Sequence, residues 1–242
     1  MKLVPFDALA LAKKVAKASL KYKDAEVIIC PGFTELAAIS EIIKGSAVKL
    51  GAQDCFWEEA GAFTGEVSPK HLLDYGVQYV IVGHSERREH LGETDKMVHQ
   101  KTRMLVSLGI TPIVCIGETF EERQAGQKEA VLLREIDAAL NGISLNKLTN
   151  LIIAYEPVWV IGSGQAVDPF EAEHTHQVIK HALYELFSEE AVEERVKIIY
   201  GGSVDPENVA GFIKQPNIKG VLIGGASLDA TEFGAIIASS VK

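Results

Sequence analysis

Residues 79–116, YVIVGHSERREHLGETDKMVHQKTRMLVSLGITPIVCI, contain one complete strand–helix–strand unit. The apolar, β-branched runs Tyr79–Gly83 and Thr111–Ile116 predict two strands, and the helical pattern of Thr94–Leu108 lies between them. A helical connection between two strands is typical of parallel pairing, in which both faces of the sheet are buried. This stretch therefore predicts an α/β fold.

The same alternation continues on both sides of this unit. Five further runs predict strands: Glu26–Cys30, Val48–Gln53, Leu151–Tyr155, Val196–Tyr200 and Gly220–Ile223. The predicted helices are Pro5–Leu20, Thr34–Ile43, Ser68–Tyr75, Thr94–Leu108, Gln127–Leu140, Asp168–Leu186, Pro206–Ile213 and Thr231–Val241. No linker divides residues 1–242, so we expect one domain, an incomplete (β/α)8-type barrel with seven parallel strands and eight helices.

The first strand of such a barrel is missing from the pattern, because the chain begins with a helix. Either the barrel is open or incomplete at that place, or Glu26–Cys30 and Gly220–Ile223 meet across the gap. An open parallel edge favours aggregation. Closure with seven strands would require a different shear and tilt.

Composition and charge argue against several partners. The net charge of −9 disfavours nucleic acid and anionic membrane surfaces, and no run reaches the roughly 20 apolar residues of a membrane span. A signal peptide must be considered at the N-terminus, but Asp7 interrupts the apolar stretch, so an amphipathic helix is favoured. Cys30, Cys55 and Cys115 lack metal-type spacing and fit a reducing cytoplasm, with Cys30 and Cys115 buried in strands.

A carboxylate follows one of the predicted strands. Glu156 comes directly after the run LIIAY, on the face of a βα barrel where active sites form. It can be a general base tuned by partial desolvation, although an isolated glutamate is more often a cap or half of an ion pair. The following residues 157–165, PVWVIGSGQ, indicate either a lid that excludes water or an ordinary glycine-rich turn.

A histidine follows another strand. His84 lies in GHSERRE after YVIV, and a neutral imidazole there could donate to a carbonyl group. A lone histidine at a strand end is more often structural, and Arg87 and Arg88 could belong to ion pairs or a subunit interface. His174 and His176 point to different sides of one helix, so we expect no metal site there.

Glycine-rich turns follow the last two predicted strands. Ser203 lies in YGGSV, and Gly224 and Gly225 lie in IGGAS. Glycines there let backbone N–H groups approach a phosphate, with a helix N-terminus behind them. Either turn alone is weak support, but together they match the usual phosphate site of a βα barrel.

Another loop carries an aromatic residue at its tip. GAFTGEV, residues 61–67, places Phe63 and Thr64 between two glycines. An exposed phenylalanine at a loop tip suggests contact with another chain, and packing on its own barrel is the alternative.

Six motifs in this order, GAFTGE, GHSERR, CIGET, AYEPVWVIGSG, YGGSV and GGASL, resemble those of the triosephosphate isomerase family. The resemblance extends from residue 26 to residue 242. It implies a TIM barrel that lacks its first strand. It also implies an enzyme of glycolysis and gluconeogenesis that interconverts dihydroxyacetone phosphate and D-glyceraldehyde 3-phosphate through an enediolate, without cofactor or metal.

The resemblance also implies roles for individual residues. Glu156 would be the general base and His84 the neutral electrophile, the pairing for which this family is the standard worked example. Glu86 would support them by pairing with a catalytic lysine. The substrate phosphate would be held by backbone N–H groups of Gly162, Ser203, Gly224 and Gly225. The loop that enters the neighbouring subunit of a homodimer would contain Phe63, Thr64, Gly65 and Glu66.

The family's catalytic lysine lies in an Asn-x-Lys motif at the end of the first strand. The simplest alignment places it immediately before Met1, and Lys2 has no predicted strand to hold it. We therefore expect very low or no turnover, because loss of one preorganised donor costs about 10²–10³ in rate. We also expect Glu86 to be an unpaired buried charge and the homodimer to be weakened. A non-catalytic phosphate-binding or structural barrel is the alternative, and a misassigned start codon would also explain the pattern.

Overall fold

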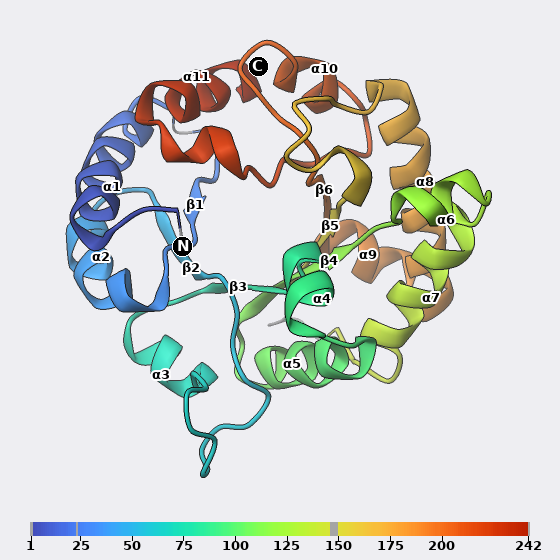
Figure 1. The fold of residues 1–242 in the computed structure, drawn as a ribbon, viewed down its shortest axis with the longest axis horizontal. Coiled ribbons are helices and arrows are strands. Elements are labelled where there is room, and N and C mark those ends of the chain that lie inside the picture. Colours follow the sequence, from blue (N-terminus) through green and yellow to red (C-terminus); the bar gives the residue numbers. More distant parts are fainter. Residues whose placement is uncertain (1, 23, 146–149, 242) are drawn as a thin grey trace.

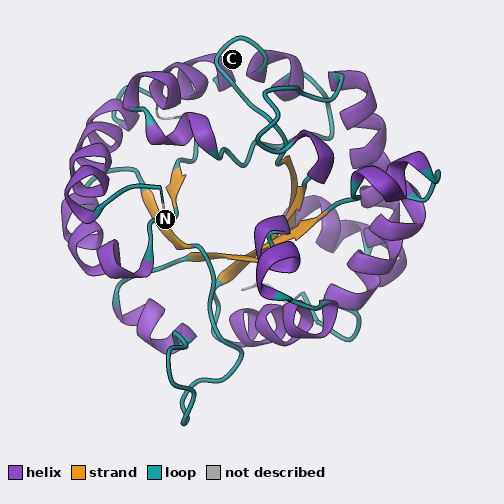
Figure 2. Cartoon of the chain, in the orientation of Figure 1, coloured by secondary structure: helices purple, strands orange, loops and turns teal. Residues whose placement is uncertain are grey.

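The computed structural model describes residues 2–22, 24–145 and 150–241. Six parallel strands follow one another around the sheet in the order of the chain: β1 (Ile28–Ile29), β2 (Lys49–Ala52), β3 (Tyr79–Val82), β4 (Thr111–Ile116), β5 (Leu151–Tyr155) and β6 (Val196–Tyr200). Figure 2 shows these strands lining the inside of a ring of helices. The parallel α/β barrel architecture expected from the sequence is therefore present.

Eleven α-helices occur in the described ranges: α1 (Pro5–Ser19), α2 (Leu36–Ile43), α3 (Pro69–Asp74), α4 (Ser85–Leu91), α5 (Asp95–Ser107), α6 (Phe120–Gln124), α7 (Lys128–Leu140), α8 (Pro169–Leu186), α9 (Glu189–Arg195), α10 (Val209–Ile213) and α11 (Ala230–Ser240). Three 3-10 helices are η1 (Phe33–Glu35), η2 (Val158–Val160) and η3 (Gly225–Leu228). The count of eight helices is wrong, because α4, α6 and α9 are short segments that the sequence pattern did not predict. None of the helices in the described part of the chain is long and apolar enough to cross a bilayer.

Side chains set several helix boundaries. The Ser68 hydroxyl accepts the N–H of Lys70 at the start of α3, and Asp168 accepts two N–H groups at the start of α8, with Pro169 in the first turn. Thr34, the first residue of the predicted helix Thr34–Ile43, lies inside η1 instead. Caps that satisfy free N–H groups explain why these boundaries follow the sequence closely.

The count of seven strands is also wrong. Gly220–Ile223 runs beside β6, but within the described ranges its only ladder contact is an isolated bridge from Val221 to Tyr200. Two backbone hydrogen bonds hold it there, from Leu222 N–H to Tyr200 O at 2.8 Å and from Tyr200 N–H to Gly220 O at 3.0 Å. Among the described residues this segment has a strand beside it on one side only, and it begins at Gly220 and is followed by Gly224. Glycine weakens strand pairing, so the single bridge does not extend into a regular strand.

The sheet is open on one side. No described segment pairs with the second edge of β1, so β1 and Gly220–Ile223 do not meet. In Figure 1 the strands form an arc whose opening faces α10 and α11. Helix α1 packs against both α2 and α11, so the outer layer of helices continues past the place where the inner sheet stops. Of the two arrangements considered from the sequence, the open barrel is the one found.

The strands are buried on both faces. Ile113 and Cys115 of β4 belong to a cluster inside the barrel, whereas Val114 and Ile116 belong to the larger core between the sheet and the helices. This alternation explains why β4 is apolar at nearly every position. Cys115 is buried as expected, but Cys30 lies just beyond β1 and is only half-buried.

Candidate active site

The predicted base and electrophile lie beside each other at one end of the barrel. Glu156 directly follows β5, and His84 lies two residues after β3. Because all six strands are parallel, their carboxyl ends meet on the same face. The distance from His84 Nε2 to Glu156 Oε1 is 3.1 Å. The fold therefore brings together two residues that are far apart in the sequence.

The backbone around His84 determines which ring nitrogen faces this site. His84 is the N-cap of α4, and its Nδ1 accepts the backbone N–H of Glu86 at 3.2 Å. A nitrogen that accepts a hydrogen bond carries no proton, so we infer that the neutral ring carries its proton on Nε2. His84 therefore presents a neutral N–H donor toward Glu156.

Glu156 has an environment that suits the base role predicted for it. Its side chain is only 2% exposed, and burial raises its pKa, although His84 and the N–H of Ser85 oppose this shift. The Ser85 N–H donates to Glu156 Oε2 at 3.0 Å. Oε1 accepts no aligned hydrogen bond from the described residues, despite the close approach of His84. A desolvated carboxylate with one oxygen left unengaged is suited to removing a proton.

Two glycines that the sequence analysis did not single out allow this packing. A Cβ built on Gly117, directly after β4, would lie 2.5 Å from the carbonyl carbon of Glu156. A Cβ built on Gly201, directly after β6, would lie 2.9 Å from Glu156 Cγ, and the Gly201 N–H donates to Tyr155 O at 2.7 Å. Only glycine permits such close approach. The available signal was a glycine immediately after a strand, in CIGE and in YGGS.

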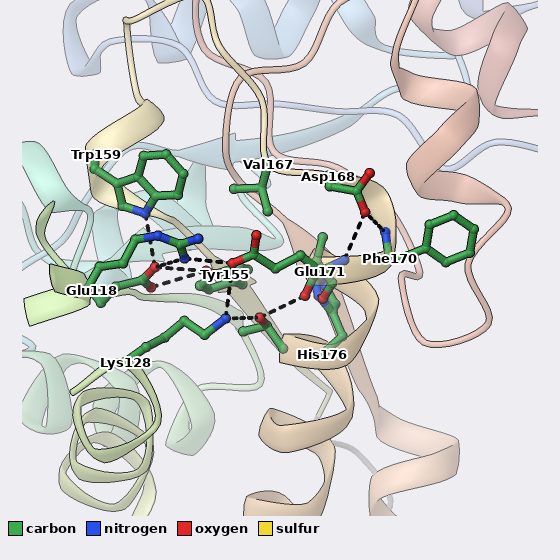
Figure 3. A network of polar contacts seen from close by, with 12 residues as sticks. Glu118, Lys128, Tyr155, Trp159, Val167, Asp168, Phe170, Glu171 and His176 are labelled. Atoms are coloured by element: carbon green, nitrogen blue, oxygen red, sulfur yellow. Dashed lines mark hydrogen bonds and ion pairs between the residues drawn. The ribbon is translucent and has the colours of Figure 1, made fainter. Parts of the chain in front are cut away.

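The segment that follows Glu156 is anchored at its start. The indole N–H of Trp159 donates to Glu118 Oε1 at 3.0 Å (Figure 3). The guanidinium of Arg123 lies 4.4 Å from the indole centroid. Glu118 is fully buried and also accepts the hydroxyl of Tyr155. Burial, together with the nearby Glu118 charge, raises the pKa of that hydroxyl. Trp159 is therefore held by a partner whose own position is fixed.

The same segment is anchored at its end. The Val167 N–H donates to the Tyr200 hydroxyl at 3.2 Å, and Asp168 caps α8 (Figure 3). Between the two anchors, Gly162 and Gly164 have φ angles of +72° and +74°, which favour glycine. A segment with two fixed ends and a glycine-rich tip is suited to act as a lid, one of the two possibilities that its sequence indicates.

The residues predicted to bind phosphate follow neighbouring strand ends. Ser203 comes shortly after β6, and Gly224 and Gly225 follow the segment bridged to β6 through Val221. Gly224 and Gly225 are exposed, and no described heavy atom lies within 4 Å of a Cβ built on either. Helix η3 begins at Gly225, so its first N–H groups are free of partners within the helix. Gly162 lies in the segment between Trp159 and Val167, away from these two turns in the sequence.

Glu86 does not have the environment expected of it. Its side chain is 67% exposed, so the prediction of an unpaired buried charge is wrong. The second residue of α4 points outward because the His84 cap directs Ser85 toward the barrel instead. Among the described residues, no lysine or arginine forms an ion pair with Glu86 or with Glu156.

The predicted contact loop projects from the barrel between β2 and α3 (Figure 1). Residues 61–66, which include Thr64, Gly65 and Glu66, are all exposed. The ring of Phe63 packs 4.6 Å from that of Phe56, yet 44% of Phe63 remains exposed. Phe63 thus contacts its own chain and still presents apolar surface. No cluster of three or more metal-ligating side chains occurs in the described ranges.

Comparisons with known proteins agree with this architecture. A sequence model of the family described as "Triosephosphate isomerase" matches residues 4–240. The chain is 48% identical over 217 residues to a triosephosphate isomerase of Geobacter metallireducens. These aligned residues cover 90% of this chain and 86% of that protein. It is 41% identical over 237 residues to one of Thermoanaerobacter sp. (strain X514), with 98% and 95% covered.

Structural comparison gives the same result. The crystal structure of triosephosphate isomerase from Bartonella henselae matches with a TM-score of 0.88 at 31% sequence identity, covering 99% of this chain and 95% of that one. A family match along nearly the whole sequence and a shared fold at this identity leave no large segment unaccounted for. The chain therefore belongs to the triosephosphate isomerase family.

Proposed function

We propose that this chain interconverts dihydroxyacetone phosphate and D-glyceraldehyde 3-phosphate, in glycolysis and gluconeogenesis. The observation that most supports this is the 3.1 Å approach of His84 Nε2 to Glu156 Oε1. A buried base and a neutral N–H donor at one point are what proton transfer next to a carbonyl group requires.

The proton transfers of this reaction use Glu156, His84 and the substrate. Glu156 removes a proton from the carbon beside the carbonyl, and the electron pair of that C–H bond forms the C=C bond of an enediolate. The charge that develops on the carbonyl oxygen is stabilised by the His84 Nε2–H. His84 gives its Nε2 proton to that oxygen and takes up the proton of the neighbouring hydroxyl group. Glu156 then returns its proton to the carbon of the original carbonyl group, and the neighbouring oxygen becomes the new carbonyl oxygen. No cofactor or metal takes part.

In this proposal the substrate phosphate is held by backbone N–H groups. Gly224, Gly225 and Ser203 supply donors at two adjacent strand ends, and Gly162 adds one from the lid. The exposed glycines and the free N-terminus of η3 support this assignment. Local attraction of this kind suits a protein whose net charge is −9.

We infer that turnover by the 242-residue chain is slow. No cation pairs with Glu86 or Glu156 in the described part of the site, and a preorganised donor to the oxyanion contributes about 10²–10³ in rate. The lack of a cation beside Glu86 and Glu156 in the described residues also favours the competing function, a phosphate-binding barrel without catalysis.

We also propose a weak homodimer formed through residues 61–67, supported by the exposed surface of Phe63. Phe63→Ser should shift the mass measured by light scattering further toward the monomer. An unchanged mass would argue against this interface. A cytoplasmic location stays a prediction from the cysteine content.

Expression in a host without its own isomerase tests the proposal. Turnover by the chain is compared with that of a version extended at the N-terminus by a strand that ends in Asn-x-Lys. Slow turnover that the extension raises supports both the assigned site and the need for a lysine. Phosphate-analogue binding without turnover in either protein would support the competing function.

A further inference from the structure

A buried carboxylate on α7 lies behind the catalytic pair, and none of the roles assigned above uses it. Glu135 is 6% exposed, and its Oε2 accepts the backbone N–H of Gly117 at 2.9 Å. Its Oε1 lies 3.8 Å from Nη1 of Arg88 and 3.7 Å from Nη2 of Arg134. The two oxygens therefore face two different parts of the molecule.

The first oxygen acts on the backbone of Glu156. Gly117 packs directly on the carbonyl group of Glu156, because a Cβ built on Gly117 would overlap that group. On one side of Gly117, Ile116 O accepts the Glu156 N–H at 2.7 Å, and on the other, Glu118 O accepts the Val158 N–H at 3.1 Å. Glu135 thus fixes the peptide that supports the base and the start of the lid.

The second oxygen acts on the backbone before His84. Arg88 Nε donates to Gly83 O at 2.8 Å, and Arg88 Nη1 donates to Asp95 Oδ1 at 2.6 Å. Gly83 directly precedes His84 in the sequence. The guanidinium that Glu135 attracts therefore holds the peptide that carries the electrophile.

We propose that Glu135 is a positioning residue whose charge state sets the alignment of Glu156 with His84. The proposal rests on the function proposed for that pair and adds a residue that does not touch the substrate. Ionised, Glu135 gives the Gly117 N–H a charged acceptor and attracts Arg88. Protonated, it loses that attraction and weakens the hydrogen bond from Gly117, so both supporting peptides are held less firmly.

The surroundings of Glu135 place its titration near neutrality. Burial raises its pKa to about 7, while Arg88 and the Gly117 N–H oppose the shift and Asp95 adds to it. The charged groups that act on Glu135 are Arg88 of α4, Asp95 of α5 and Arg134 of α7. Other charged or titratable groups on α7 are Lys128, Glu129 and Asp137, and neighbouring elements add His99 of α5, Glu122 of α6 and Glu171 of α8. Arg88 and Arg134 are the cations within ion-pair distance of Glu135 among the described residues.

Nuclear magnetic resonance of labelled protein tests the link without depending on turnover. The Glu135 carboxyl carbon and the amides of Gly117, Gly83 and Glu156 are followed from about pH 5 to about pH 9. We expect one midpoint near 7 in all four signals. Glu135→Gln keeps an acceptor for Gly117 and should abolish that midpoint at the amides. Glu129→Gln, the same change at an exposed position of α7, should preserve it.

Two results would overturn the proposal. One is the same midpoint at the Gly117 and Glu156 amides in Glu135→Gln. The other, visible in the parent protein even if that variant does not fold, is titration of Glu135 that the Glu156 amide does not follow.

Turnover in the same samples separates this inference from the proposed function. If the parent is active, the acid limb of its kcat/KM profile should lose one ionisation in Glu135→Gln and keep it in Glu129→Gln. If the parent is inactive at every pH while the amides titrate together, the proposed function fails and the positioning role of Glu135 stands.

Discussion

Replacing Gly117 by alanine should lower both stability and turnover. The added Cβ would lie 2.5 Å from the carbonyl carbon of Glu156, whereas real Cβ atoms essentially never approach within 3.0 Å. The carbonyl oxygen of Glu156 lies closer still to that Cβ, so the Glu156 peptide must move by about 1 Å or more in a closely packed interior. Its 2.7 Å hydrogen bond to Ile116 O is strained as a result. Overpacking costs about 1–3 kcal/mol and a weakened hydrogen bond about 1 kcal/mol, so we expect a loss of about 3 kcal/mol.

Turnover should fall by about 10- to 100-fold, because a misplacement of about 1 Å costs about 10² in rate. Urea unfolding gives the stability, and an isomerase assay on the folded fraction gives the rate. Gly234→Ala is the control, because no described atom lies within 4 Å of a Cβ at that position of α11. If Gly117→Ala matches this control in both measurements, Gly117 does not position Glu156.

Three further changes test separate contacts. Trp159→Phe removes the N–H that Glu118 accepts, so unfolding free energy should drop by about 1–2 kcal/mol, and limited proteolysis should show faster cleavage in the lid only. The pKa of Glu135 is about 7 in the folded protein and 4.5 as a reference value. The contribution of Glu135 to the free energy of unfolding is therefore fully present below pH 4.5 and is lost as the pH rises through 7. Urea unfolding should show this loss, about 3 kcal/mol, in the parent and not in Glu135→Gln. Lys101→Met removes an ammonium that lies 2.7 and 3.1 Å from two buried carboxylates, and thermal unfolding should reveal a loss of about 3–5 kcal/mol.

Much of the fold could be predicted because its strands are buried on both faces. The runs at β4 and β5 are apolar at nearly every position, so their bounds follow from composition alone. Polar residues immediately after such runs lie on one face of a parallel barrel, which is how Glu156 and His84 were found. Caps such as Asp168 fixed helix starts for a local reason that the sequence contains.

The features of the fold and of the site that could not be predicted depend on contacts between distant segments. Gly220–Ile223 has the composition of a strand, but strand pairing requires neighbours, and one side of this segment has none in the described ranges. The prediction that Glu86 is buried came from its pairing with a catalytic lysine in the family, and no sequence pattern supported it. Glu86 is exposed. A glutamate in a charged helix such as α7 ordinarily faces solvent, so only the packed structure reveals that Glu135 reaches Gly117.

The proposed function requires that Glu156 transfers a proton in this chain, with His84 as its partner. Deuterium incorporation from solvent into dihydroxyacetone phosphate, followed by proton magnetic resonance, can detect this step even when isomerisation is slow. Protein made in a host without its own isomerase should catalyse the exchange, and Glu156→Gln should abolish it. Equal exchange by the parent and by Glu156→Gln would contradict the claim.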